Sequence, residues 1–569
     1  MNRSFDNPLR WLAIPLVLCA LLIIPVVWDG AQGWIFPDSL SYIDLASDAV
    51  RVSPTVLLKN AYWSPLYPAM LATALAALRP SLATEVTVFY FVHWLTFVFA
   101  AAGFGVFWWT FLQWLRGTGW VELREDDRLF RALAGFGYVL FFVAHLNRTL
   151  WYLTPDLLME GTVLFAAALA IRLYRPGAGI RHSVWLGAAM GAGYLAKAPM
   201  FLLSLALLAI LWLMPPPDRH GRRHSLVALA VFCLVAAPLV VSLSREKHRL
   251  TFGDAGKLNY AYHIGDLPKH SGWIGQNPKD GVPAHPPRTI SDLVLLMEFR
   301  TPVSGTIPIW YDPSYWWEGV KVHFDLGRQL NGLLRPFRMV HSVQSILLAL
   351  VAIAIALTLL SGRVRRAIRG SGIQAWILLV WPLMALTMYA LVVFNYRYTV
   401  GFILLLCLGA LTLVLRVLRP AAAIKLLLGG IALLAIASVV LLRPVVKGAL
   451  HSGSPTEPLT RVEGQDNRAS SIAVAQELAR MGIRAGDEIA VLGTGLDGYY
   501  ARMAGVRVVA QIWEDPDRIE NLEASQVGQI LSQLRQTGVK ALLSRTKRGF
   551  VHDDGWVAVP RTDVFIRVL

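Results

Sequence analysis

Residues 63–78 read WSPLYPAMLATALAAL, an apolar stretch with two prolines at its start and no charged side chain. A helix needs ~20 apolar residues to cross a bilayer. This stretch is shorter, and it has the length expected for a segment that re-enters the membrane or lies on its surface. Its placement decides the side of every later segment, because each crossing reverses the side of the chain.

The composition indicates that part of the protein's surface contacts membrane lipid. The chain has 569 residues, of which 55% are hydrophobic and only 16% are charged, too few charges for one soluble domain of this size. The net charge of +16 would indicate nucleic acid in a soluble protein. Here the Lys and Arg residues fall in short clusters between apolar stretches, as in cytoplasmic loops. We therefore expect no nucleic-acid partner.

The apolar stretches predict a polytopic α-helical membrane protein with about eleven transmembrane helices. The candidate spans are 11–28, 87–114, 131–146, 157–174, 184–196, 199–214, 225–243, 342–361, 374–394, 399–416 and 425–442. The first follows two arginines but has no small-residue cleavage site, so we expect an uncleaved span. The three cysteines lie inside apolar runs, where they act as small hydrophobic side chains, and no disulfide framework is expected.

The arginine clusters orient the chain. If residues 65–78 crossed the membrane, each cluster would lie outside, against the positive-inside bias. We therefore predict that this stretch does not cross. The amino terminus is then cytoplasmic, the carboxyl terminus is outside, and the cytoplasmic loops are those near 115–130, 175–183, 215–224, 362–373 and 417–424.

Three large outer segments follow from this topology: residues 29–86, residues 244–341 and the tail after Arg443. The tail alternates helical and strand patterns. They predict helices at 473–481 and 524–536 and strands at 488–492, 506–512, 541–544 and 564–568. We expect a transmembrane domain at 1–442 and a small extracytoplasmic α/β domain at 443–569.

One motif in the tail points to a cofactor. Residues 493–498 read GTGLDG after a predicted strand, which matches the dinucleotide fingerprint. The helix expected after it is short and contains Gly505, and a nicotinamide pool is not expected outside the membrane. We therefore interpret the motif as a glycine-rich turn of an accessory domain and predict no such cofactor.

The charged groups that could carry chemistry stand beside the predicted spans, on the outer face. Asp38 follows the first span, and Asp156 begins a later one after Thr154 and Pro155. Lys197 lies between two short spans, and Arg397 stands at the start of a late span. Two alternatives stay open: the carboxylates fit helix N-caps, and the cations fit anchors that reach for lipid headgroups.

This order of groups resembles the membrane glycosyltransferases of the GT-C type, among them the lipid A aminoarabinose transferases and the protein O-mannosyltransferases. The resemblance covers roughly residues 10–420, and its short motifs gain specificity from their order and their common membrane face. It implies an enzyme of the bacterial inner membrane. Such an enzyme transfers a sugar, with inversion, from a polyprenyl-phosphate donor to a hydroxyl of a glycan, lipid or protein acceptor at the outer face.

The resemblance also implies roles for individual residues. Asp38 corresponds to the catalytic base, and Asp156 to a second acidic position. The donor phosphate is expected at Lys197 and Arg397, with Arg148 as a weaker candidate. One departure is that the second carboxylate many relatives carry beside the first-loop aromatic and proline pair is missing around residues 63–68.

The second outer segment is rich in aromatic residues, including Tyr311 and Trp316. Together with Tyr42 of the first outer segment, these residues are expected to cover a groove for the acceptor at the membrane interface. An aromatic belt that anchors the loop to lipid headgroups fits the same composition.

The sequence leaves two other functions open. A transporter or flippase of lipid-linked sugars would show inverted repeats and broken helices, whereas an oligosaccharide ligase or polymerase needs the same base and the same phosphate clamp. No cluster of Asp, Glu and His at ligand spacing indicates a metal. We expect no cofactor besides the lipid-linked donor. The sequence does not identify the sugar, the acceptor or the oligomeric state.

Overall fold

The computed structural model describes residues 12–33, 35–117, 128–146, 148–217, 221–267, 273–300, 304–338, 373–416, 418–451, 468–493, 495, 498–513, 519, 521–545, 550 and 555–569. The predicted span at 342–361 and most of the predicted loop at 362–373 lie outside these ranges. So do Thr494, Leu496 and Asp497 of the glycine-rich motif.

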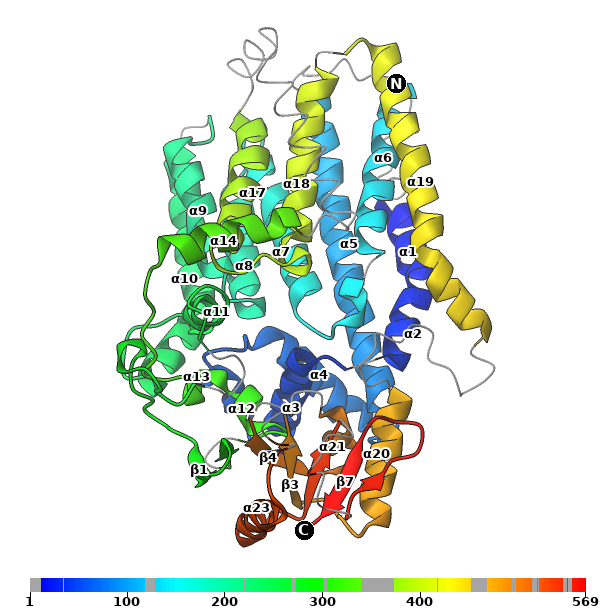
Figure 1. Ribbon diagram of the computed structural model, residues 1–569. Helices are drawn as coiled ribbons and strands as arrows, with labels where there is room; N and C mark the ends of the chain where they lie inside the picture. The colour runs from blue at the N-terminus through cyan, green and yellow to red at the C-terminus, as the bar shows by residue number, and fades with distance from the viewer. Residues whose placement is uncertain are drawn as a thin grey trace.

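Most of the described chain forms a bundle of upright helices (Figure 1). The helices of the bundle are α1 (Ile14–Leu22), α2 (Ile24–Gln32), α5 (Glu85–Gly117), α6 (Arg128–His145), α7 (Asp156–Leu173), α8 (Ile180–Ala196), α9 (Met200–Leu213), α10 (Gly221–Glu246), α17 (Ile373–Val392), α18 (Tyr396–Leu415) and α19 (Pro420–His451). In the described ranges, six helices are long and apolar enough to cross a membrane. The predicted multi-pass membrane protein is confirmed, and the count of about eleven spans stays a prediction.

Small residues let the helices of the bundle pack closely. A Cβ atom on Gly103 of α5 would lie 2.8 Å from the carbonyl oxygen of Gly161 on α7. On α8, a Cβ atom on Gly187 would lie 2.4 Å from the carbonyl oxygen of Ala228 on α10. Close backbone approach of this kind is how helices associate in a membrane, where burial of apolar surface supplies little attraction between them.

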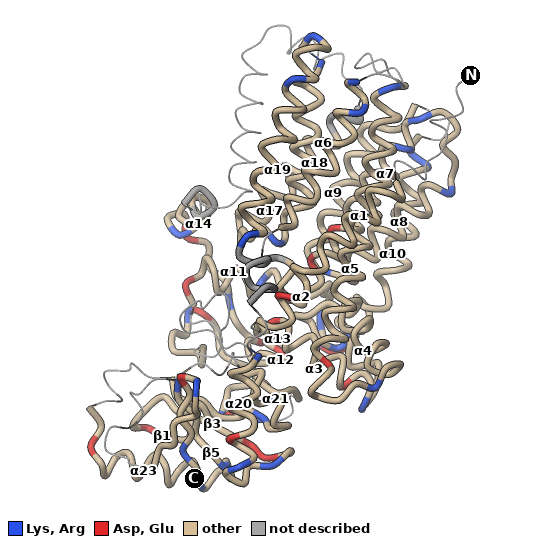
Figure 2. Tube along the Cα trace, turned by 90° about the vertical axis from the view of Figure 1, so that its right-hand side faces the viewer, with Lys and Arg blue, Asp and Glu red and all other residues tan. Residues whose placement is uncertain are grey.

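Lysine and arginine gather at the end of the bundle that is opposite to the carboxyl-terminal sheet (Figure 2). Helix α7 begins at Asp156 and carries Arg172 in its last turn. At 1.5 Å per residue, the helix separates these two residues by roughly 24 Å. The two ends of the bundle thus differ in charge as the sequence predicts for cytoplasmic and outer faces.

The first outer segment forms α3 (Pro37–Arg51), the short helix η2 (Pro54–Leu58) and α4 (Leu66–Leu78). Helix α4 covers most of the apolar stretch at 63–78 and has only 13 residues, which is short for a crossing. It packs against α3 at the end of the bundle (Figure 1). That this stretch does not cross the membrane stays a prediction.

The second outer segment and the tail build one sheet together. The segment forms α11 (Ala255–His263), η4 (Pro278–Asp280), β1 (Arg288–Ser291), β2 (Leu296–Glu298), α12 (Pro308–Tyr311), α13 (Pro313–Trp316) and α14 (Leu326–Arg338). The tail forms α20 (Arg468–Arg480), β3 (Glu488–Leu492), α21 (Tyr499–Ala504), β4 (Arg507–Ile512), α23 (Ala524–Gln536), β5 (Ala541–Ser544), β6 (Val557–Ala558) and β7 (Phe565–Val568). The strand order is β1-β2-β4-β3-β5-β7-β6. Only the pairs β4–β3 and β3–β5 are parallel, and β2 joins β4 antiparallel with Leu296 opposite Ile512.

The main strands of the tail lie where the sequence predicts them, but β1 and β2 are absent from that prediction. The sheet therefore takes strands from both sides of residue 443. After the glycine-rich motif, α21 has only six residues, whereas a dinucleotide site uses the start of a longer helix in a βαβ unit. The absence of a dinucleotide stays a prediction.

A buried ion cluster joins the tail to the helical bundle. Arg502 of α21 donates to Asp44 Oδ1 of α3 at 2.9 Å and to both Glu85 carboxylate oxygens of α5 at 2.8 Å. It also donates to Ser47 Oγ at 3.0 Å. Burial raises the pKa of the Asp44 carboxyl, although Arg502 and two hydrogen bonds from Thr306 act against that rise. The guanidinium therefore offsets much of the cost of burying two carboxylates.

Arg502→Leu should release the tail from the bundle. The change leaves Asp44 and Glu85 buried without their cation, and breaking a buried pair costs about 3–5 kcal/mol. We expect a lower unfolding temperature and faster limited proteolysis of the detergent-solubilised protein. Arg480→Leu is the control, because the Arg480–Glu477 pair leaves the arginine side chain 69% exposed and exposed pairs contribute little. Equal effects of the two variants would contradict this account.

Candidate active site

Four charged side chains from four separate segments meet at the end of the bundle that is nearer to the carboxyl-terminal sheet. Arg397 Nη2 donates to Asp38 Oδ2 at 2.7 Å, and Arg397 Nε lies 3.6 Å from Asp156 Oδ2. Lys197 Nζ forms an ion pair with Asp156 Oδ1. The structure thus brings together the two acidic and the two main cationic residues that the sequence singles out. We name Asp38, Asp156, Lys197 and Arg397 the four-charge cluster.

Neither carboxylate of the cluster is an N-cap. The N-cap of α3 is Phe36, so Asp38 lies inside the first turn, and its side chain points to Arg397. The N-cap of α7 is Pro155, and Asp156 likewise lies in the first turn. The N-cap interpretation is wrong for both residues, because α3 begins two positions and α7 one position earlier than that role requires. A carboxylate in a first turn is still favoured by the helix dipole.

The two cations point into the protein rather than toward lipid headgroups. Lys197 is the C-cap of α8, with extended backbone geometry, and its side chain is only 18% exposed. Its ammonium lies 3.5 Å from the centroid of the Tyr398 ring. A headgroup anchor would extend its charge to the surface, so the inward contacts contradict that interpretation for Lys197 and, at 6% exposure, for Arg397.

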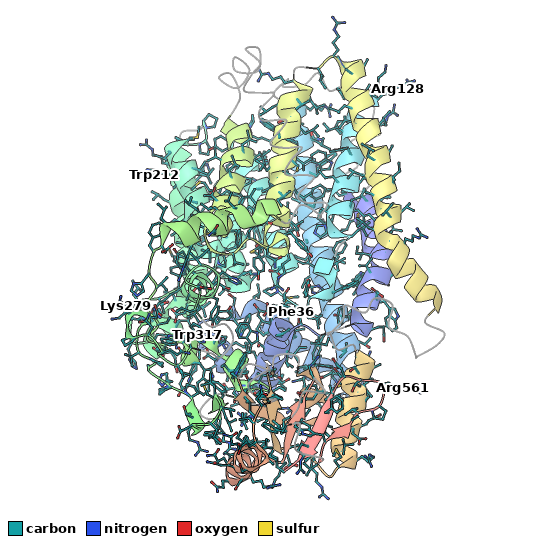
Figure 3. All side chains as sticks on the ribbon, in the orientation of Figure 1. Phe36, Arg128, Trp212, Lys279, Trp317 and Arg561 are labelled. Carbon is teal, nitrogen blue, oxygen red and sulfur yellow. The ribbon has the colours of Figure 1, made fainter. Side chains whose placement is uncertain are left out.

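Aromatic rings surround the guanidinium of Arg397. Its carbon atom lies 5.0 Å from the Phe36 ring, 5.2 Å from the Tyr152 ring and 4.9 Å from the Tyr398 ring. Phe36 lies where the bundle meets the outer segments (Figure 3). Such cation–π contacts are strongest where water is excluded. Asn395 fixes the start of α18 by accepting a hydrogen bond from the backbone N–H of Arg397 at 3.1 Å.

Two nitrogens of this guanidinium, Nε and Nη1, have no hydrogen-bond partner in the described part of the chain, and Nε lies 3.6 Å from Asp156 Oδ2. Both atoms are buried. Unsatisfied buried donors of a charged group are costly and rare. An anion that enters the cluster would satisfy Nη1, so this atom marks the position where a phosphate oxygen fits best.

Trp310 belongs to the site although the sequence does not single it out. Its indole N–H donates to Asp38 Oδ1 at 3.3 Å. Its carbonyl oxygen accepts from Ser41 Oγ at 2.8 Å and from Trp63 Nε1 at 3.1 Å. The second outer segment is rich in aromatic residues, and this composition was the available indication of the contact. Composition alone does not identify the aromatic residue that contacts Asp38.

The remaining predicted residues lie around the cluster or apart from it. Tyr42 is buried beside Trp63, and burial raises its pKa, with further contributions from Asp156 and Asp38. Tyr311 donates to Asp48 Oδ2 at 2.8 Å, and Trp316 donates to the carbonyl oxygen of Pro308 at 3.0 Å. These hydrogen bonds are directed away from the four-charge cluster.

The phosphate role of Arg148 and the question of a metal stay predictions. Arg148 begins the short helix η3 (Arg148–Trp151), and its side chain lies outside the described part of the protein. Among the residues that the structure describes, no group of three or more His, Cys, Asp or Glu could hold a metal ion.

The fold has counterparts among solved structures, although no family model and no curated protein sequence matches this chain. The apo oligosaccharyltransferase of Archaeoglobus fulgidus superimposes with a TM-score of 0.53 at 12% identity, over 95% of this chain and 70% of that chain. The same enzyme in complex with an inhibitory peptide and a dolichol-phosphate gives 0.52 at 13% identity, over 94% and 69%. This chain has a GT-C-like fold.

Another solved structure shares the GT-C-like fold at a lower score. ArnT from Cupriavidus metallidurans, bound to undecaprenyl phosphate, gives a TM-score of 0.49 at 13% identity, over 98% of both chains. The two superpositions on the oligosaccharyltransferase confirm the predicted resemblance for the fold, and the roles of the individual residues stay predictions.

Arg397→Met should destabilise the outer end of the bundle. It leaves Asp38 and Asp156 without the guanidinium between them, and an uncompensated buried charge costs about 3–5 kcal/mol. We expect a lower unfolding temperature, and a partial recovery in the double variant Arg397→Met/Asp38→Asn, because Asp156 keeps its ion pair with Lys197 and the unpaired charge of Asp38 is then gone. Arg419→Met is the control, because Arg419 is exposed. No recovery in the double variant would show that Arg397 and Asp38 do not act as a pair.

Proposed function

We propose that this protein transfers a sugar from a polyprenyl-phosphate donor to an acceptor hydroxyl at the outer face of a bacterial inner membrane. The observation that carries the proposal is the four-charge cluster, which is buried at the outer end of an apolar helical bundle. The GT-C-like fold supports the enzyme class. The oligosaccharyltransferase whose structure contains a dolichol-phosphate supports a polyprenyl-phosphate as the donor class.

The cluster fits a donor phosphate by exchange of ionic partners. In the described structure, Lys197 and Arg397 bind the two carboxylates. A phosphate that enters between the cations takes over part of these contacts and adds a hydrogen bond from Arg397 Nη1. Charge-assisted bonds from arginine and lysine to phosphate are strong, and they strengthen as the leaving phosphate gains negative charge.

Asp38 is the base of the proposed reaction. Once the phosphate binds Arg397, the Asp38 carboxylate can accept the proton of the acceptor hydroxyl. The acceptor oxygen forms a bond to the anomeric carbon while the bond from that carbon to the phosphate oxygen breaks, and the polyprenyl phosphate leaves. Attack from the face opposite to the phosphate inverts the anomeric configuration. Asp156 keeps Lys197 in place through their ion pair.

The charge distribution supports an outer location of this site. Among the described residues, Lys and Arg gather at the far end of the bundle (Figure 2), and Arg128 marks that end (Figure 3). By the positive-inside rule, that end faces the cytoplasm. The amino terminus is then cytoplasmic, and the sheet and the four-charge cluster face the periplasm.

Transfer of an oligosaccharide in place of a single sugar is the second candidate. The fold likeness to an archaeal oligosaccharyltransferase favours this candidate, and the base and the phosphate clamp serve both reactions equally. The mass added to the acceptor distinguishes them: one sugar unit supports the first candidate, and a larger block supports the second.

Asp38→Asn should abolish transfer. Loss of a general base typically lowers the rate by about 10²- to 10⁴-fold, while the phosphate clamp is retained. We would express the variant in cells that lack the native protein and compare envelope lipids and glycans by mass spectrometry. Asp48→Asn is the matched control, because Asp48 lies on the same helix and its amide still accepts from Tyr311. Normal product with Asp38→Asn would remove Asp38 from the mechanism.

Lys197→Met should weaken binding of undecaprenyl phosphate to the purified protein. A charge-assisted hydrogen bond contributes about 1.5–3 kcal/mol, which corresponds to roughly a 10- to 100-fold change in Kd. Lys425→Met, on the exposed surface of α19, is the control. Uncharged undecaprenol should bind both variants equally, since it lacks the phosphate. Unchanged Kd values for undecaprenyl phosphate would exclude Lys197 from the clamp.

A further inference from the structure

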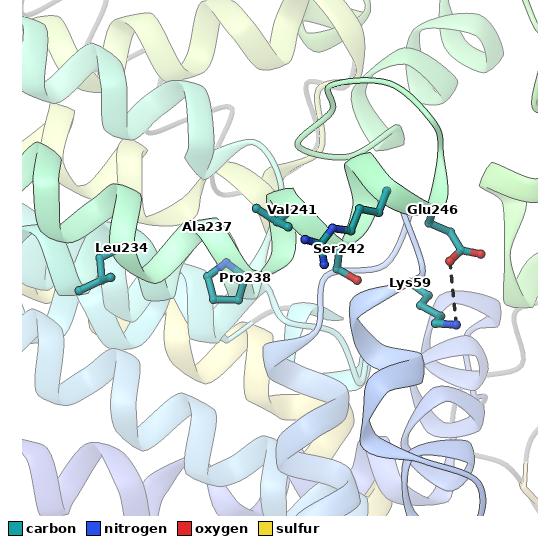
Figure 4. A pocket seen from close by; sticks show the side chains of 8 residues that line it. Lys59, Leu234, Ala237, Pro238, Val241, Ser242 and Glu246 are labelled. Carbon is teal, nitrogen blue, oxygen red and sulfur yellow. Dashed lines mark ion pairs between the residues drawn. The ribbon is translucent and has the colours of Figure 1, made fainter.

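A groove outside the four-charge cluster lies along the last part of α10 (Figure 4). It encloses about 530 Å³. Its floor is apolar and its mouth is charged. The floor is lined by Leu234, Ala237, Pro238 and Val241, and the mouth by Ser242, Arg245, Glu246 and Lys59. We name this feature the α10 groove.

The α10 groove opens away from the helical bundle. The opposite face of α10 packs against α8, where a Cβ atom on Gly191 would lie 2.6 Å from the Val235 side chain. On the groove side, Leu234 is 74% exposed and Val241 is 45% exposed. Because α10 is among the helices that are apolar enough to cross a membrane, this exposed apolar surface faces lipid chains.

Pro238 shapes the floor of the groove. Proline has no N–H and cannot donate to the carbonyl oxygen four residues earlier, here that of Leu234, and its ring pushes that turn of the helix apart. The carbonyl oxygen of Leu234 therefore lacks this helical hydrogen bond on the floor of the groove, inside α10.

The mouth of the groove carries more positive than negative charge. Lys59 follows η2 and lies 4.0 Å from Glu246 at the end of α10. Arg245 is the second cation of the mouth. Two cations beside one carboxylate leave a net charge of +1, which attracts an anionic headgroup at the membrane surface.

The length of the groove fits one leaflet. Leu234 and Arg245 are eleven residues apart in α10 (245 − 234), which corresponds to ~16 Å of helix. That is about half of the ~30 Å hydrocarbon core of a bilayer. A fatty acyl chain of one leaflet matches this distance, whereas a polyprenyl chain is much longer than the groove.

We propose that the α10 groove binds an anionic phospholipid of the outer leaflet. Its phosphate lies between Lys59 and Arg245, and an acyl chain lies along the floor between Leu234 and Val241. The site is separate from the donor clamp at Lys197 and Arg397 and does not depend on the proposed transfer reaction.

The bound lipid also supports the first outer segment. Lys59 is followed by Asn60, whose side chain donates to the carbonyl oxygen of Tyr311 at 2.8 Å and accepts from the backbone N–H of Trp63 at 2.9 Å. A phosphate held at Lys59 thus fixes the chain next to the residues that position Trp63 and Tyr311.

Native mass spectrometry of the full-length protein in detergent tests the proposal, with phosphatidylglycerol and phosphatidylcholine as probes. We expect tighter binding of phosphatidylglycerol by roughly 10- to 30-fold, since each cation near the surface attracts anionic lipid. The variant Lys59→Gln/Arg245→Gln should lose this preference. Val241→Trp, which fills the floor and keeps the charges, should weaken both lipids. Arg222→Gln/Arg223→Gln, at the other end of α10, is the control and should behave as the wild type.

Two results would overturn the proposal. The first is an unchanged preference for phosphatidylglycerol in the Lys59→Gln/Arg245→Gln variant together with unchanged lipid binding by Val241→Trp. The second is displacement of phosphatidylglycerol by equimolar undecaprenyl phosphate in the Lys197→Met variant, since the groove would then belong to the donor lipid. Absence of such displacement, with loss of the preference in the double variant, supports a separate phospholipid site.

Discussion

The guanidinium of Arg397 and the two carboxylates beside it form the interaction on which the outer end of the bundle depends. Charged groups buried at a membrane boundary are stable only when they are paired. Because Asp38 and Asp156 begin helices, and because Lys197 and Arg397 stand at the ends of two others, the pairs fix where four helices converge. The same convergence gathers the groups that we propose bind a phosphate and accept a proton.

A second constraint connects this site to the carboxyl-terminal sheet. The backbone N–H of Val508 in β4 donates to the carbonyl oxygen of Thr306 at 2.8 Å, and Thr306 donates to Asp44 through both its N–H and its hydroxyl. Four residues later, Trp310 donates to Asp38. The sheet therefore holds the segment that carries Trp310, so the tail contributes to the geometry around Asp38 although none of the cluster's charges comes from it.

Local patterns in the sequence predicted the local structure well. Apolar stretches located the described helices of the bundle, and the order of Asp38, Asp156, Lys197 and Arg397 beside predicted spans led to the expectation that they share one face. The sequence patterns did not predict contacts between residues that are far apart in the chain. The pairs Arg502–Glu85 and Trp310–Asp38 join residues hundreds of positions apart, and β2 pairs with β4 without a pattern that marks the partner. The N-cap assignments failed because the helices begin at Pro37 and Asp156, which lie two residues and one residue before the expected starts.

The shared sheet imposes an order on biosynthesis. Strand β2 ends at Glu298 and its partner β4 begins at Arg507, 209 positions later (507 − 298). Ribosomes release the chain from the amino terminus. The backbone groups of β2 that pair with β4 therefore have no partner strand while several helices are still being inserted. Such an unpaired strand edge is a template for wrong pairing. A nascent chain that ends before β4 would therefore expose the unpaired edge of β2. The export and degradation machinery could recognise an incomplete protein by this exposed edge.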